Sequence, residues 1–220
     1  MEIVADATRR YLRGVGPDHD EIQAEMADYA DENGFPIVGP EAGGVLQLLA
    51  RLTDAESAFE FGSGYGYSAY WFLRGMDGGR VVLTEFDEAE LDMAREFFDR
   101  AGFASRATFE HGDAVSIVDD HEGPFDLVLV DHQKERYAEA FERVRDKVAP
   151  GGVVVADNVM RGPIDFEALV AYVDGDDAAL DGHDEKTRGI ADYLDAVRAA
   201  DGFETVALPV GEGIAVSTRV

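Results

Sequence analysis

The chain has 220 residues, of which 46% are hydrophobic, so it can form one conventional domain with a buried core. Asp and Glu number 46 against 19 Lys and Arg, which gives a formal net charge of -27 at pH 7 and disfavours a broad phosphate-binding groove. The absence of cysteine excludes disulfides, thiolate metal sites and cysteine nucleophiles.

The acidic residues are spread among apolar residues instead of forming a tail or a cluster. We interpret this excess as adaptation to high salt, where the repulsion between carboxylates is screened, and therefore expect a halophilic source. The segment 1–6 lacks the basic and apolar pattern of a signal peptide. No apolar run approaches the roughly 18 residues that cross a membrane. We expect a cytoplasmic protein without membrane contacts.

The first 55 residues of the predicted single domain contain helix signals and no strand candidate. A helix is expected over Asp18–Asn33, with Asp18 and Glu21 as a capping box and Gly34 as the stop signal. After a loop with two prolines, a second helix is expected through Ala50. Three apolar residues of this second helix are expected to share its buried face: Val45, Leu48 and Leu49.

From Ser57 onward, short apolar runs alternate with amphipathic segments, which is typical of a parallel doubly wound sheet. The strands are expected at Ala58–Phe61, Val81–Glu85, Thr108–Glu110, Phe125–Asp131 and Gly152–Asp157. The helices between them are expected at Ser68–Leu73, Asp87–Ala101 and Tyr137–Val148. Two later runs, Thr205–Pro209 and Ile214–Thr218, predict an antiparallel hairpin. The acidic segment 174–185 is expected to be an exposed, mobile insertion. The sequence predicts an α/β fold with a mostly parallel sheet of seven strands.

A glycine-rich turn, Gly62 to Gly66, follows the first expected strand, at the edge where parallel sheets bind ligands. Glu85 ends the second strand, where a carboxylate can accept both hydroxyls of a ribose. A dinucleotide-binding protein shares both features, but Glu60 beside the turn would repel a pyrophosphate. The same carboxylate suits the ammonium and sulfonium charges of S-adenosylmethionine. We therefore predict S-adenosylmethionine as the ligand.

Three oxygen-bearing side chains end neighbouring strands: Asp131, Asp157 and Asn158. Since the carboxyl ends of parallel strands meet at one edge, this set predicts a site for Mg²⁺ or a similar divalent cation. The alternative is that the aspartates only cap turns. Lys134 follows Asp131 closely and could serve as a general base, whereas a solvated loop lysine is the alternative.

These motifs together resemble the cation-dependent O-methyltransferases, the family of the catechol and caffeoyl-coenzyme A enzymes. The resemblance runs from Gly34 to the C-terminus and implies the class I methyltransferase fold. It implies that Val38, Gly62 and Ser68 contact the methionine part of the methyl donor and Glu85 its ribose. Adenine would lie by Asp113, Ala114 and His132. Asp131, Asp157 and Asn158 would bind the metal, with Asp131 also beside the donor, and Lys134 would be catalytic.

The chain departs from the catechol branch at two donor-site positions, where Gln133 and Gly64 replace aromatic or aromatic-type residues, and it lacks a secure counterpart of the substrate-orienting acid. The expected reaction is methyl transfer to a hydroxyl of a small catechol-like or phenolic acceptor. Two alternatives stay open: methylation of a hydroxylated transfer-RNA nucleoside, and a non-catalytic nucleotide-binding module. The negative charge disfavours a nucleic-acid partner. The N-terminal helices are compatible with a lid or with a homodimer interface.

Overall fold

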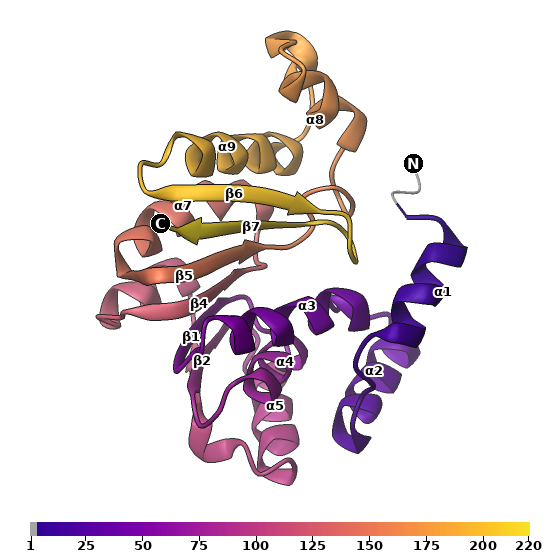
Figure 1. The fold of residues 1–220 in the computed structure, drawn as a ribbon, viewed down its shortest axis with the longest axis vertical. Coiled ribbons are helices and arrows are strands. Elements are labelled where there is room, and N and C mark those ends of the chain that lie inside the picture. The colour runs from indigo at the N-terminus through magenta and orange to yellow at the C-terminus, as the bar shows by residue number, and fades with distance from the viewer. Residues whose placement is uncertain (1–3) are drawn as a thin grey trace.

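The fold is built around one mixed sheet of seven strands, seen in a computed structural model that describes residues 4–220. The strands are β1 (Ser57–Phe61), β2 (Arg80–Glu85), β3 (Ala107–His111), β4 (Phe125–Val130), β5 (Val148–Ala156), β6 (Phe203–Leu208) and β7 (Ile214–Arg219). Their spatial order is β3–β2–β1–β4–β5–β7–β6, and only β7 pairs antiparallel to its neighbours (Figure 1). The predicted parallel sheet with a terminal hairpin is confirmed.

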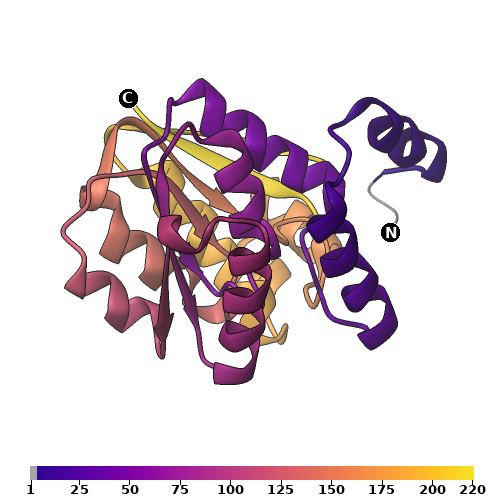
Figure 2. The same ribbon diagram turned by 90° about the horizontal axis from the view of Figure 1, so that it is seen from below.

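Helices cover both faces of this sheet (Figures 1 and 2). The α-helices are α1 (Asp6–Val15), α2 (Glu21–Asn33), α3 (Gly39–Leu52), α4 (Tyr67–Gly75), α5 (Glu88–Arg100), α6 (Ala114–Ile117), α7 (Tyr137–Val144), α8 (Phe166–Val173) and α9 (Glu185–Ala199). Short 3₁₀ turns are η1 (Ala104–Arg106), η2 (Val118–Asp120), η3 (Lys134–Arg136), η4 (Arg145–Lys147) and η5 (Asp177–Leu180). No helix among the described residues is long and apolar enough to span a membrane.

Successive residues of the central strands enter two different cores. In β4, Leu127 and Leu129 pack with α2 to α5, whereas Val128 and Val130 pack with α6, α7 and α9. A strand that is buried on both faces has to be apolar at every position, which explains the uninterrupted run Leu127–Val130. Consecutive side chains alternate between the faces, so one strand supports both layers.

The N-terminal region differs from the prediction at two points. A helix, α1, precedes the two expected ones, and α2 begins at Glu21 with Asp20 as its cap, not Asp18. Asp20 Oδ1 accepts a hydrogen bond of 2.9 Å from the backbone amide of Gln23, so the predicted cap, Asp18, was two residues early. The stop signal is confirmed, because Gly34 adopts the left-handed conformation at the end of α2.

The buried face of α3 is centred on Ala42, Leu46 and Ala50, and of the three predicted residues Val45 and Leu49 are only partly buried at its edge. Leu48 is 51% exposed, whereas Ala42, Leu46 and Ala50 are buried. A Cβ atom at Gly43 would lie 2.2 Å from Trp71 Nε1, so α3 can approach α4 closely only through small side chains. Close packing thus selected a different face from the one that residue hydrophobicity favoured.

The boundaries of one helix and one strand also differ from the prediction. The expected helix Tyr137–Val148 ends as an α-helix at Val144, and β5 begins at Val148 instead of Gly152. The early part of β5 is irregular, since its pairing with β4 shifts register between Phe125 and Leu127. The acidic segment 174–185 is mostly exposed, as expected, and contains the turn η5.

Candidate active site

A cavity of about 660 Å³ opens at the carboxyl edge of the sheet, beside the junction of β1 and β4. The chain folds to the two sides from this junction, which is where open α/β sheets bind ligands. Most of the predicted site residues line the cavity: Val38, Gly62, Ser68, Glu85, Ala114, Asp131, His132, Lys134, Asp157 and Asn158. The side chains of Glu60 and Asp113 do not belong to its wall.

Gly62 lies where the loops after β1 and β4 meet in the wall. Its φ of 81° lies in the left-handed region, and an added Cβ atom would be 2.5 Å from the backbone oxygen of Asp131. Only glycine permits this approach without displacing one of the two loops. The loops after β1 and β4 are therefore in direct backbone contact.

Glu85 is fixed by backbone donors. Its Oε2 accepts a hydrogen bond of 2.9 Å from the amide of Gly64, and its Oε1 accepts bonds of 2.7 Å and 3.2 Å from the amides of Phe86 and Asp87. This carboxylate holds the glycine turn against the end of β2. Its predicted contact with a ribose is compatible with its place in the wall.

Glu60 lies beneath the glycine turn and is fully buried. Its Oε1 accepts a hydrogen bond from the Ser68 hydroxyl, while its Oε2 has no partner within residues 4–220. Burial raises the pKa of the Glu60 carboxyl to about 8, and the charges of Asp131 and Glu85 act in the same direction. The carboxyl therefore reaches the cavity through Ser68 instead of lining it as we expected.

Asp131, Asp157 and Asn158 meet in the wall as the strand ends predicted. Asp157 Oδ1 is buried without a hydrogen-bond partner among the described residues. Burial, reinforced by the negative charge of Asp131, raises the pKa of Asp157 well above its ordinary value. Within residues 4–220 no three His, Cys, Asp or Glu side chains form a metal-binding group, so a site here depends on the amide of Asn158. An unsatisfied carboxylate oxygen beside two further oxygen donors fits a hard cation.

Lys134 is buried against these acids. Its Nζ donates to Asp131 Oδ1 at 2.9 Å, to the Tyr137 hydroxyl at 2.7 Å and to the backbone oxygen of His132 at 3.3 Å. Only 8% of the residue is exposed, so the alternative of a solvated loop lysine does not fit. The turn η3, where Lys134 sits, aims its ammonium into the cavity wall.

His132 supplies a flat, neutral surface to the cavity. Its ring stacks on Tyr137, with centroids 5.4 Å apart and planes inclined by 10°. Burial, together with the charges of Arg136 and Lys134, lowers the pKa of His132 to about 3. A neutral imidazole with both ring nitrogens unpaired in the described part of the chain can contact an aromatic ligand.

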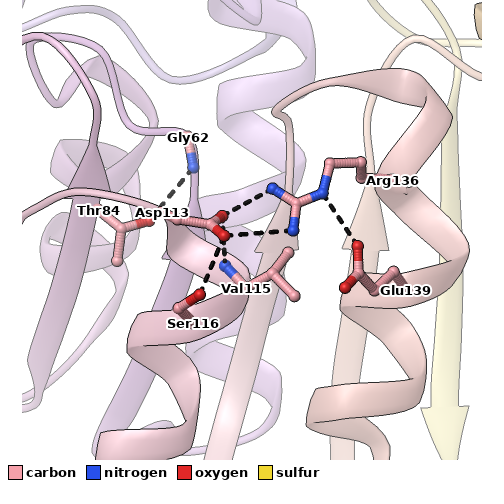
Figure 3. Close-up of polar contacts among 7 residues, drawn as sticks. All are labelled: Gly62, Thr84, Asp113, Val115, Ser116, Arg136 and Glu139. Carbon is pink, nitrogen blue, oxygen red and sulfur yellow. Dashed lines mark hydrogen bonds and ion pairs between the residues drawn. The ribbon is translucent and has the colours of Figure 1, made fainter.

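Asp113 is the N-cap of α6, and its carboxylate faces Arg136 instead of the cavity (Figure 3). Its carboxylate accepts from the Val115 amide at 3.2 Å and from Arg136 Nη1 at 2.7 Å. The neighbours of Asp113, Gly112 and Ala114, do line the cavity. At this loop, Ala114 and the backbone, and not the Asp113 carboxylate, are therefore placed to contact adenine.

Phe86 and Glu90 are among the wall residues that sequence reasoning missed. Phe86 follows Glu85, is 50% exposed and lines the cavity together with Gln133. Glu90 approaches the glycine turn, and burial, helped by the charge of Glu85, raises the pKa of its carboxyl to about 7. The sequence feature that could have indicated Phe86 is an aromatic residue directly after the acid that ends β2, because a large aromatic side chain in an exposed loop often marks a binding site.

A doubly wound sheet with a terminal antiparallel hairpin, and a carboxylate-rich cavity at its switch point, defines the architecture of a class I methyltransferase. Residues 20–220 match the family model described as O-methyltransferase. The chain belongs to this O-methyltransferase family.

Individual relatives agree with this assignment. The chain is 36% identical over 154 residues to the catechol O-methyltransferase of Niastella koreensis, covering 67% of this chain and 69% of the relative. It is 26% identical to caffeoyl-CoA O-methyltransferase 2 of Petunia hybrida, covering 98% and 91% of the two chains. The O-methyltransferase of Bacillus cereus, solved in complex with SAH, superposes with a TM-score of 0.83 at 26% identity, over 97% of each chain. The activity class is S-adenosylmethionine-dependent O-methylation, as the sequence predicted.

Proposed function

We propose that the protein transfers a methyl group from S-adenosylmethionine to a hydroxyl oxygen of a small catechol-like or phenolic acceptor, assisted by a divalent cation. The observation that carries this proposal is Asp157 Oδ1, which is buried without a hydrogen-bond partner among residues 4–220 and shares a cavity with Asp131, Lys134 and the glycine turn. Methyl transfer requires the donor-binding turn and the acceptor-binding carboxylates to share one cavity, because the donor methyl and the acceptor oxygen must lie about 3 Å apart and in line.

Asp131, Asp157 and Asn158 are the residues that would hold the cation. When bound, Mg²⁺ or a similar cation would bind acceptor oxygens and lower the pKa of the reacting hydroxyl. Two carboxylates and one amide are oxygen donors of the type that Mg²⁺ prefers. The raised pKa of Asp157 supports this assignment, since a nearby positive charge would relieve the cost of its ionisation.

The remaining groups of the wall position the reactants. We assign Lys134 to the proton of the acceptor hydroxyl, because it lines the same cavity wall as Asp131, Asp157 and Asn158. We assign Glu85 to the donor ribose, and His132 and Ala114 to its adenine. Val38, Gly62 and Ser68 would contact the methionine part, with Glu60 acting through the Ser68 hydroxyl.

The charges at the mouth of the cavity support a small acceptor over RNA. A second hollow of about 1070 Å³ adjoins the cavity and shares Gly162, Pro163, Lys186 and Glu135 with it. Its basic side chains are Arg161, Lys186 and Arg188, and its acidic ones are Glu135, Asp165, Glu167, Asp184 and Glu185. An excess of carboxylates at the entrance would repel a phosphate backbone, even where salt screens part of the repulsion.

The test is transfer of labelled methyl groups to a panel of catechols, phenols and transfer RNA at high salt. We expect methylation of at least one catechol, loss of turnover after complete metal removal, and recovery when Mg²⁺ is restored. Asp157→Asn should lower turnover while donor binding persists. Turnover that survives metal removal would exclude the role of the cation. Methylation of transfer RNA alone would support the RNA alternative, and metal-independent donor binding without any turnover would support the non-catalytic module.

A further inference from the structure

A two-pronged ion pair joins the loops after β3 and β4. Arg136 Nη1 lies 2.7 Å from Asp113 Oδ1, and Nη2 lies 3.3 Å from Asp113 Oδ2. Figure 3 shows the guanidinium facing the carboxylate edge to edge between the starts of α6 and α7. We call this pair the 113–136 clamp. Two parallel hydrogen bonds fix orientation as well as distance, which a single contact does not do.

Each half of the clamp is held from behind. Arg136 Nε donates to Glu139 Oε2 at 2.9 Å, and Asp113 Oδ2 accepts from the Ser116 hydroxyl at 3.0 Å. The two side chains are 29% and 32% exposed, so water reaches only part of the contact. Hydrogen bonding from Arg136 lowers the pKa of Asp113, which keeps the carboxylate charged. Such a buttressed pair is less easily broken than a solitary surface ion pair.

The clamp connects two different parts of the cavity wall. On the Asp113 side, the flanking residues Gly112 and Ala114 line the cavity, and the Gly112 amide bonds to the backbone oxygen of Glu85 at 2.9 Å. On the other side, Arg136 closes the turn η3, which begins at Lys134. The clamp thus spans from the segment assigned to adenine and ribose to the segment that carries the assigned proton acceptor.

We propose that Arg136 is a positioning residue that, through Asp113, sets the separation of the adenine-side loop from the Lys134 turn. The effect on donor binding rests only on the family assignment, whereas the effect through Lys134 rests on the proposed function. Arg136 does not line the cavity, so its influence is exerted through the two loops that it joins.

The chain contains a matched control. Arg143 Nη1 lies 2.7 Å from Asp119 Oδ2 and joins α7 to η2, the turn that directly follows α6. This second pair therefore links the same two regions, but the chain neighbours of Asp119 and Arg143 do not line the cavity, whereas Gly112, Ala114 and Glu135, which flank the clamp residues, do. If the 113–136 clamp served only to hold α6 against α7, removing Arg136 or Arg143 would have the same effect on SAH binding.

The experiment compares Arg136→Met, Arg136→Lys and Arg143→Met. Methionine keeps much of the apolar part of the side chain and removes the guanidinium. Lysine restores the positive charge but cannot form the two parallel hydrogen bonds. For each variant we would measure SAH affinity by calorimetry, the thermal unfolding midpoint, and kcat and KM for the donor with the best acceptor. Asp113→Asn provides a second route, because asparagine can still cap α6.

We expect Arg136→Met to weaken SAH binding about tenfold and to lower kcat at saturating donor, with partial recovery in Arg136→Lys. Arg143→Met should change neither value and should shift the unfolding midpoint less, because this pair is more exposed and makes a single hydrogen bond. Should Arg136→Met fail to fold, Asp113→Asn should show the same weakening of SAH binding. Equal SAH affinity in Arg136→Met and Arg143→Met, or an unaffected Asp113→Asn, would overturn the positioning role. If Arg136→Met weakens SAH binding as expected but neither the parent nor any variant shows turnover, the result would count against the proposed function and would still support the clamp.

Discussion

Replacing the buried carboxyl of Glu60 by an amide should change how the stability of the protein depends on pH. Glu60→Gln keeps the shape of the side chain and an oxygen that can accept from Ser68, but it cannot ionise. In the parent, burial raises the pKa of this carboxyl from its ordinary value of 4.5 to about 8. The native state therefore holds the proton more tightly than the unfolded chain does between these two values.

The sign and size of the effect follow from proton linkage. A raised native pKa contributes stability that is fully present below the unfolded pKa and is lost as pH rises through the native pKa. Each pKa unit corresponds to about 1.4 kcal/mol, so the rise to about 8 corresponds to an upper limit of about 5 kcal/mol at high pH. The stability of Glu60→Gln relative to the parent should thus increase by a few kcal/mol between about pH 5 and about pH 8.5.

Denaturant unfolding without donor, at constant high salt across this pH range, measures the difference directly. Other titrating groups, including Asp157, occur in both proteins and largely cancel. Glu204→Gln, an exposed carboxylate on β6, controls for the loss of one negative charge. A parent-to-variant difference that stays constant across the range would refute the reasoning, because it would mean that Glu60 ionises in the folded protein as it does in the unfolded chain.

Three other substitutions test the wall. Tyr137→Phe removes the hydroxyl that accepts from Lys134 Nζ at 2.7 Å, and should lower kcat about tenfold with little change in donor KM; an equal kcat across pH would contradict this. Gly189→Ala places a Cβ atom 2.4 Å from the Lys134 backbone oxygen, and should cost about 1–3 kcal/mol in denaturant unfolding and reduce kcat, whereas unchanged values would show that α9 yields freely. Phe86→Ala should weaken SAH binding by about 1–3 kcal/mol in calorimetry, because its ring lines the cavity beside Glu85, and kcat at saturating donor should be preserved; an unchanged affinity would contradict this.

The parts of the site predicted best are those that the strand order dictates. Gly62, Asp131 and Asp157 follow strands whose apolar runs are unmistakable, and parallel strands bring their carboxyl ends together. The buried side of α3 could not be predicted in the same way, because the close approach at Gly43 depends on Trp71, which is distant in sequence.

Side-chain direction was the other limit. The position of Glu60 at a strand end is readable from the sequence, but whether its carboxyl faces the cavity or the interior depends on Ser68 and the turn above it. The 113–136 clamp joins residues that are 23 positions apart and lie in separate loops. Nothing in the sequence around Arg136 indicates that it pairs with Asp113. Only the folded structure shows that the Arg136 guanidinium contacts Asp113.

The backbone contact between Gly62 and Asp131 bears on how this enzyme could be modified. With no space between the two loops, a ligand that displaces the glycine turn also moves the residue that we assign to the cation. Affinity for the donor and affinity for the cation should then be thermodynamically linked, and each ligand must alter the binding of the other by the same factor. A change of the donor site to accept a new cofactor analogue would consequently also alter cation affinity, which further substitutions would have to restore.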